Sequence, residues 1–183
     1  MEARAILGVI RTQKHDFLNH LQVILGYLQL NKIPEAKKYI QEVVLETGRL
    51  SKINHLYPAE AALALLVAQN EAAKRGITVE YDIQTDLQAS ALTGDEISAC
   101  LEDVLAQVIL SLSPPRIVDR QIKLYLTEEQ GCYNCQINFY PGNSGDLEER
   151  IKVIHERLNP RKGRAEFTVN SGRGVISLYF PAR

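Results

Sequence analysis

Apolar positions in the first third of the chain recur every three or four residues. This spacing is typical of amphipathic helices, and it runs from about residue 2 to residue 30 and again from Pro34 to about His55. Residues 31–34 interrupt it, and proline suits the first turn of a helix because no N–H is needed there. The pattern therefore predicts an antiparallel helical hairpin over residues 1–57. Its apolar positions include Leu7, Ile10, Phe17, Leu21, Ile24 and Leu28, and then Ala36, Tyr39, Ile40, Val43, Leu50 and Ile53.

The predicted hairpin has a wide apolar face and nothing in its own sequence to cover it. Two copies facing each other form a four-helix bundle, the smallest arrangement that buries both faces. We therefore predict a homodimer through residues 2–56. In the alternative, the C-terminal half folds back and covers the hairpin. That arrangement is less favoured because the C-terminal half has its own elements to bury.

Beyond Pro58, segments with helical spacing of apolar residues are interspersed with segments in which apolar and polar residues alternate as in strands. Helices are predicted over residues 59–75, 95–112 and 146–158, and the last of these has Asp146 and Glu149 spaced as in a capping box. Strands are predicted over residues 77–83, 122–126, 133–140, 165–169 and 176–180, with a turn at residues 171–174. Because every strand has one apolar side, residues 58–183 are predicted to form a two-layer α/β sandwich. The whole chain is then an α+β protein.

Composition changes this picture little but excludes some classes of function. The chain has 183 residues, 45% of them hydrophobic and 23% charged, which is typical of a globular protein. A net charge of -1 and the lack of any Lys/Arg run argue against a nucleic-acid partner. No apolar stretch approaches the roughly 18 to 20 residues that span a bilayer. The first residues lack the profile of a signal peptide, so we expect a cytoplasmic protein without a membrane partner.

The cysteines do not form a convincing metal or redox site. Cys132 and Cys135 have the C-x-x-C spacing of a redox pair or half a zinc site. They fall in a predicted strand, where an offset of three places the two sulfur atoms on opposite faces. A zinc site needs four ligands, and only Cys100 and distant histidines remain as candidates. We interpret the cysteines as structural and expect no metal bound by this chain.

The candidate chemistry lies in the first helix, at residues 11–22, RTQKHDFLNHLQ. At about 100° per residue, His15 falls roughly 130° from the centre of the apolar arc, on a polar face that it shares with Arg11, Asn19 and Gln22. The imidazole is therefore predicted to point into water, where a substrate as large as a protein can reach it. His20 lies about 140° further around the helix, which makes it a poor second acceptor. His55 and His155 have no neighbours in the sequence that would support a catalytic role.

Residues 14–30, KHDFLNHLQVILGYLQL, resemble the phosphoacceptor helix of the sporulation initiation phosphotransferase B family. They also resemble related sensor histidine kinases whose helix reads R-H-D-x-x-N-H-x-Q. The resemblance continues in element order, because residues 61–79 are similar to the helix–glycine–strand that opens a kinase ATP-binding domain. Residues 174–181 are similar to the last strand of that domain. This resemblance implies a dimeric four-helix bundle followed by a degenerate histidine-kinase ATP-binding domain.

The chain departs from working kinases at the positions that hold nucleotide. Those kinases carry asparagines for magnesium and phosphates on a long helix, where this chain has Gln107 and Ser111. They also have an Asp-x-Gly-x-Gly loop, whereas residues 140–145 lack the aspartate, and no second glycine-rich loop occurs before Gly163. Residues 142–145 either cradle a phosphate at the next helix N-terminus or form only a helix-entry turn. We favour the helix-entry turn. We therefore expect no nucleotide cofactor and no autophosphorylation with ATP.

The resemblance implies a phosphotransferase of a two-component phosphorelay in sporulation initiation. His15 would take a phosphoryl group from an aspartyl-phosphate of one response regulator and pass it to an aspartate of another. A neutral imidazole is a competent nucleophile, because the reference pKa of histidine is about 6.5. Asp16 either orients the ring, takes its proton or is merely solvated, and Asn19 could hydrogen-bond the ring or the partner. Arg11, Lys14 and Gln22 are candidate partner contacts, and Mg²⁺ is expected from the response regulator.

Two other functions are compatible with the sequence. A soluble histidine kinase core with an atypical ATP site would explain why the whole α/β domain is present. A non-catalytic adaptor that binds response regulators or kinases would also need a dimeric surface, but it would not need the histidine motif at residues 11–22. Labelling of His15 by ATP without a donor protein would favour the kinase. Activity that survives loss of His15 would favour the adaptor.

Overall fold

The computed structural model describes residues 3–114, 116–141 and 145–183. The chain divides into two compact units, Met1–Lys52 and Ile53–Arg183. No helix in the described part of the chain is long and apolar enough to cross a membrane.

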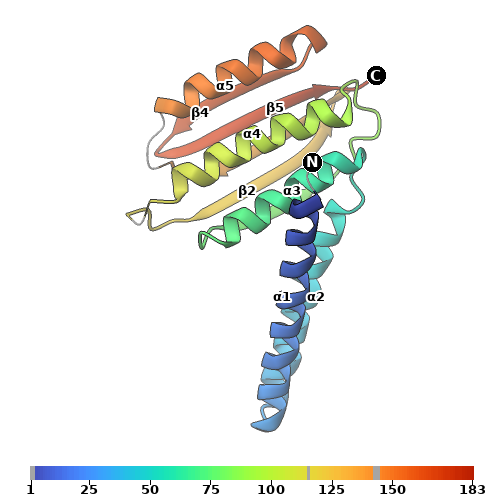
Figure 1. Cartoon of the computed structure of the whole chain (residues 1–183), viewed down its shortest axis with the longest axis vertical. Coiled ribbons are helices and arrows are strands. Elements are labelled where there is room, and N and C mark those ends of the chain that lie inside the picture. Colours follow the sequence, from blue (N-terminus) through green and yellow to red (C-terminus); the bar gives the residue numbers. More distant parts are fainter. Residues whose placement is uncertain (1–2, 115, 142–144) are drawn as a thin grey trace. The chain divides into compact units, whose positions relative to one another are not determined.

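The first unit consists of two long helices, α1 (Ala3–Gln29) and α2 (Ile33–Ile53), which lie side by side in Figure 1. The turn between them closes by backbone hydrogen bonds, in which the Asn31 N–H donates to the Leu28 carbonyl and the Lys32 N–H to the Tyr27 carbonyl. Asn31 has a φ of 55°, a left-handed conformation that asparagine tolerates better than most residues. The predicted helical hairpin is therefore present, with the second helix ending at Ile53 and not at His55.

The boundary between the units falls before the expected position of 57/58. Ile53, the last residue of α2, is fully buried and Leu56 is 5% exposed, and both belong to the second unit. The Tyr57 N–H donates to the carbonyl of Asp86 at 2.7 Å. This hydrogen bond ties Tyr57, the residue after Leu56, to the second unit.

In its described residues, the second unit has three α-helices and a five-stranded sheet. Figure 1 shows how these elements are arranged. The helices are α3 (Ala59–Ala73), α4 (Gly94–Leu112) and α5 (Gly145–Leu158), followed by the short 3-10 helix η1 (Asn159–Arg161). The strands are β1 (Thr78–Ile83), β2 (Gln121–Glu129), β3 (Cys132–Phe139), β4 (Arg164–Asn170) and β5 (Arg173–Pro181). Their order is β1-β2-β3-β5-β4, with β1 parallel to β2 and every other pair antiparallel.

The core of this unit lies between the sheet and its helices. Buried and partly exposed residues alternate along β2, β3 and β5, so the sheet has one covered face. Figure 1 shows α3, α4 and α5 on that face. The α+β fold with a two-layer α/β sandwich is therefore confirmed. Its largest fully buried side chains include Ile97, Leu105, Leu112, Ile122, Leu124, Tyr133, Ile137, Phe139 and Phe180.

Two local predictions have different outcomes. The turn at residues 171–174 is a two-residue hairpin, with φ of 52° at Ser171 and 80° at Gly172, as the strands' twist favours. The capping box at Asp146 is wrong in register, because α5 begins at Gly145 and Asp146 lies within its first turn. The residue that precedes this helix, and the choice between a phosphate cradle and an entry turn, lie outside the described residues, since positions 142–144 are not described.

Candidate functional site

His15 lies midway along α1 with its side chain in solvent. The side chain is 73% exposed, and that of the neighbouring Asp16 is 59% exposed. The prediction that the imidazole points away from the hairpin interior is therefore confirmed. A reacting group in this position is open to a partner as large as a folded domain.

The other histidine of α1 points into the hairpin instead. His20 is partly buried, and its Nδ1 lies 2.9 Å from the hydroxyl of Tyr39 on α2. The Tyr39 ring also packs against His20 and Tyr27, with ring centroids 5.9 and 6.1 Å apart. His20 therefore helps to hold α1 against α2, together with the buried Val9 and Ala36. The sequence of α1 alone gives no signal for the Tyr39 contact, because the partner comes from the other helix.

The ring of His15 has two polar neighbours, and both approach Nδ1. The Asn19 Nδ2 lies 3.1 Å from Nδ1, and the Asp16 Oδ1 lies 3.5 Å from it. An amide N–H needs Nδ1 as an acceptor, whereas a carboxylate needs Nδ1 to carry the proton, so the two contacts favour opposite tautomers. Rotation of the Asn19 amide by 180° presents its oxygen, which accepts from Nδ1–H. Among the described residues, the contacts of Asp16 and Asn19 with the ring are both made at Nδ1 and not at Nε2.

The predicted partner contacts also lie on the exposed surface of α1. Arg11, Lys14 and Gln22 are all exposed, within two turns of His15. Arg11 and Lys14 place two cations within about one turn of the ring. Positive charge there would attract an acidic partner or a phosphoryl group. All six predicted site residues are thus exposed between positions 11 and 22 of α1.

An apolar stripe of α1 and α2 borders this surface. Leu18 lies about 60° around the helix from His15, at the near edge of the stripe. Phe17 is 62% exposed and Leu25 is 54% exposed, which is unusual for large apolar side chains on regular helices. The hairpin covers Val9 and part of Tyr27 and leaves this stripe open. The stripe consists of Leu7, Ile10, Phe17, Leu18, Leu21, Leu25 and Leu28 of α1, with Ile33, Ile40 and Val44 of α2.

Gln107 and Ser111, the two positions where the chain departs from working kinases, both lie on α4. On α4, the Ser111 hydroxyl donates to the Val108 carbonyl at 2.8 Å, so it is used within the helix. Among the described residues, no group of three or more His, Cys, Asp or Glu is placed to hold a metal ion. Gln107 is partly exposed on the same helix.

The three cysteines are free thiols on the α/β unit. Cys135 is buried on the covered face of β3, whereas Cys132, three positions earlier, is partly exposed and lies 3.5 Å from the Phe180 carbonyl. Burial raises the pKa of the Cys135 thiol to about 12 and also raises the pKa of Cys132. Both thiols are therefore poor nucleophiles, in agreement with their interpretation as structural residues.

The remaining histidines are distant from His15 in the sequence. His55 is exposed, just after α2. His155 is partly buried on α5, where its Nδ1 lies 3.2 Å from the carbonyl oxygen and 3.3 Å from the backbone nitrogen of Ala165. His155 thus has a structural contact that the sequence did not indicate.

The helical hairpin is similar to a known family of proteins. Residues 1–56 match the family model of the sensor kinase SpoOB type, α-helical domain. Among curated proteins, no sequence matches the chain significantly.

Solved structures of histidine kinases share the fold at low sequence identity. The Acinetobacter baumannii histidine kinase AdeS matches with a TM-score of 0.55 and 12% identity, over 92% of this chain and 98% of that one. The nucleotide-free catalytic domain of the histidine kinase ThkA has a TM-score of 0.55 and 10% identity, over 68% and 90%. The blue-light activated kinase EL346 of Erythrobacter litoralis has a TM-score of 0.51 and 10% identity, over 67% and 61%. The α/β unit thus resembles histidine kinase ATP-binding domains.

Proposed function

Because its N-terminal residues match the SpoOB-type helical domain and the chain is related to sensor kinase cores, we propose that this two-component signalling protein is a phosphorelay phosphotransferase. The observation that supports it most directly is the exposed His15 on the matched hairpin, with Asp16 and Asn19 beside its Nδ1. His15 would carry a phosphoryl group between the aspartates of two response regulators. A cytoplasmic role in sporulation initiation is part of the proposal and rests on the family resemblance.

The transfer step requires one free nitrogen lone pair and an activated phosphate. With the proton on Nδ1, the Nε2 lone pair attacks phosphorus, and the bond from phosphorus to the aspartate oxygen breaks to leave a carboxylate. The imidazole ring gains positive charge as the new nitrogen–phosphorus bond forms. The Asp16 carboxylate and the Asn19 amide oxygen can accept from Nδ1–H and stabilise that charge. The second transfer reverses these events, with the acceptor carboxylate as nucleophile.

The partner supplies what this surface lacks. An acyl phosphate is already a good phosphoryl donor, so catalysis consists mainly of aligning nitrogen, phosphorus and leaving oxygen. Mg²⁺ would enter with the response regulator and neutralise charge on the phosphoryl oxygens. On this chain, Arg11, Lys14 and Gln22 would contact the receiver domain around the reacting atoms.

The proposal includes a homodimer through residues 2–56. The exposed apolar stripe is continuous over both helices, and pairing two such faces gives a four-helix bundle with a buried core. Because His15 lies about 60° around the helix from Leu18, at the near edge of the stripe, the dimer would leave the ring accessible from the side of the bundle.

The kinase-core reading remains the second candidate. It is favoured by the α/β unit, which has the fold of histidine kinase catalytic domains over most of its length. Against it stand Gln107 and Ser111, which replace the asparagines that the family resemblance leads us to expect on α4.

The test compares phosphoryl donors on the purified full chain. The protein is incubated either with ATP and Mg²⁺ or with a single-domain receiver carrying a radiolabelled aspartyl-phosphate, and acid-labile label on the protein is measured. We expect label from the phosphorylated receiver, mapped to His15 by mass spectrometry, and none from ATP alone. His15→Gln removes the label, while His55→Gln, at another exposed histidine, is the matched control and keeps it.

Each other result selects a different function. Steady labelling of His15 by ATP without a receiver identifies a kinase core. Receiver binding that is unchanged in His15→Gln, with no label from any donor, identifies an adaptor and overturns the proposal.

A further inference from the structure

The second unit has an open strand edge at β4, the outer strand of the sheet. β4 pairs only with β5 in the strand order of the described residues. At its first end the carbonyl oxygen and the backbone nitrogen of Ala165 lie 3.2 and 3.3 Å from Nδ1 of His155, so the backbone at this position points away from β5. In an antiparallel pair the outward-facing positions alternate, which makes the N–H and carbonyl groups of Phe167 and Val169 face outward too. The open edge therefore begins after Ala165.

A groove lies between this edge and α5. Its volume is about 400 Å³, which suits a short stretch of peptide. Apolar side chains of Ile151, Ala165 and Phe167 line it from both elements. The polar part of the lining comes from α5 and consists of Glu148, Lys152, His155 and Glu156. A strand edge beside an apolar groove is the arrangement by which proteins add a peptide strand to a sheet.

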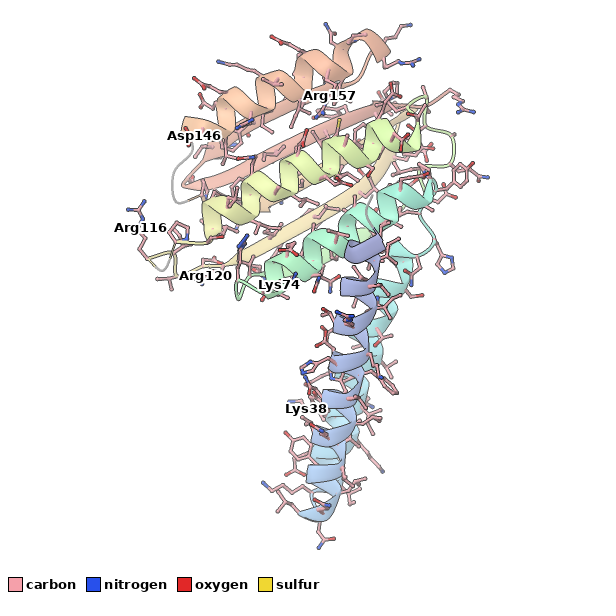
Figure 2. The ribbon with its side chains drawn as sticks, viewed as in Figure 1. Lys38, Lys74, Arg116, Arg120, Asp146 and Arg157 are labelled. Carbon is pink, nitrogen blue, oxygen red and sulfur yellow. The ribbon has the colours of Figure 1, made fainter. Side chains whose placement is uncertain are left out.

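The groove is on the flank of α5 that faces away from α4. Arg157 binds Asp103 of α4 at 2.6 Å, and Figure 2 shows Arg157 on the side of α5 toward that helix. His155 precedes Arg157 by two positions, which places it about 160° away around the helix. The groove is thus separate from the surface between α4 and α5.

The charged side chains that line the groove indicate which kind of ligand it binds. Glu148, Lys152 and Glu156 follow each other at four-residue intervals on α5 and line the groove together. Within the described part of the chain, none of the three makes a salt bridge. Two carboxylates and one ammonium leave a net negative charge, which complements a basic side chain on the ligand.

We propose that the β4 edge and the α5 groove bind an extended segment of a partner protein as an added strand. The segment is apolar at alternate positions, where its side chains enter the groove, and carries a basic residue that meets Glu148 or Glu156. Main-chain hydrogen bonds to Phe167 and Val169 hold it in register. This site goes beyond the proposed phosphoryl transfer and gives the α/β unit a binding role of its own.

The test uses the full chain and a fluorescent, acetylated heptapeptide, KVSVKVS-amide, with EVSVEVS-amide as the acidic comparison. Fluorescence anisotropy measures binding, and NMR shift changes locate it. Val169→Pro deletes an outward N–H without removing a β4–β5 hydrogen bond, so we expect binding of KVSVKVS to weaken at least tenfold, by roughly 1.4 kcal/mol or more. Val169→Ala keeps the N–H and is expected to change the affinity less than threefold.

A second pair of variants tests charge without touching the backbone. Glu148→Gln combined with Glu156→Gln is expected to weaken KVSVKVS and to reduce its preference over EVSVEVS. Glu149→Gln, an exposed position on α5 outside the groove, leaves both affinities unchanged. Lack of binding by either peptide, or equal effects of Val169→Pro and Val169→Ala, overturns the proposal. Self-association of the chain that Val169→Pro abolishes would identify a second copy as the occupant and also overturn it.

Discussion

At the residue scale, the two histidines of α1 show how helix position decides chemistry. His15 is exposed with two polar neighbours at Nδ1, whereas His20, five positions later, contacts Tyr39 inside the hairpin. The angular step of a helix predicted that His15 points into water and that His20 lies about 140° away from it. The identity of the Tyr39 partner could not be predicted, because it depends on how the second helix packs against the first.

The Asp16 carboxylate is predicted to assist the transfer. Asp16→Asn removes the only anionic group found near Nδ1 among the described residues, so the charged ring of the transition state is less stabilised. We expect label transfer from a phosphorylated receiver to slow by about tenfold, the effect of roughly 1.4 kcal/mol. Rapid-quench measurement of the transfer rate tests this, with Glu46→Gln, an exposed acid on α2, as control. Equal rates for the two variants would leave Asp16 as a merely solvated acid.

The His20–Tyr39 contact is predicted to be structural. Tyr39→Phe deletes the hydroxyl that lies 2.9 Å from His20 Nδ1, and we expect the free energy of unfolding to fall by about 1 kcal/mol. Denaturant unfolding followed by circular dichroism measures the change. Tyr57→Phe, at a tyrosine that is 61% exposed, is the control with no expected effect. Phosphoryl transfer to His15 should survive in Tyr39→Phe, and its loss would assign a further role to this contact.

At the element scale, the N-terminus of α4 shows a cap that the pattern did not reveal. The Thr93 hydroxyl accepts from the Glu96 N–H, while the Glu96 carboxylate accepts from the Thr93 N–H at 2.8 Å. Arg161 of η1 also lies 3.3 Å from Glu96. This reciprocal pair satisfies two backbone donors at the helix start. The sequence contains the Thr-x-x-Glu spacing, but apolar periodicity placed the helix start without using it.

Because of this cap, the stability of the α/β unit is expected to change with pH in the acidic range. The Thr93 backbone N–H, and to a lesser degree Arg161, hold the pKa of Glu96 below its usual value. A lowered folded-state pKa contributes stability above the usual carboxyl pKa, and that stability is lost as the pH falls through the folded-state value. We therefore expect Glu96→Gln to be less stable at pH 7 and to lose less stability than wild type on acidification. Thermal unfolding from pH 7 to pH 3 measures this.

The hydroxyl side of the cap provides a second element-scale test. Thr93→Ala removes the acceptor of the Glu96 N–H and is expected to cost about 1 kcal/mol at neutral pH. Thr93→Ser keeps a hydroxyl and should retain most of the stability, as judged by urea unfolding. If both substitutions destabilise equally, the methyl packing of Thr93 matters more than its hydrogen bond.

At the scale of the whole molecule, the uncovered apolar stripe predicts the assembly. Phe17→Asp places a charge on the stripe in each copy, where a dimer would have to desolvate it, and we expect the dimer dissociation constant to rise about a hundredfold or more. Sedimentation equilibrium measures the constant. Leu45→Asp is the matched control, because Leu45 is 66% exposed on α2 and lies off the stripe. A wild-type chain that remains monomeric at micromolar concentration would contradict the predicted bundle.

The sequence by itself determined the elements, the two-part organisation and the direction of His15. These depend on local spacing, since helical and strand periods fix which side chains share a face. Only the tertiary structure decided the rest: the boundary at Ile53, the Tyr39 contact of His20, the start of α5 at Gly145 and the open β4 edge beside its groove. Each of these depends on contacts between segments far apart in the chain, where packing and backbone pairing, and not local pattern, set the geometry.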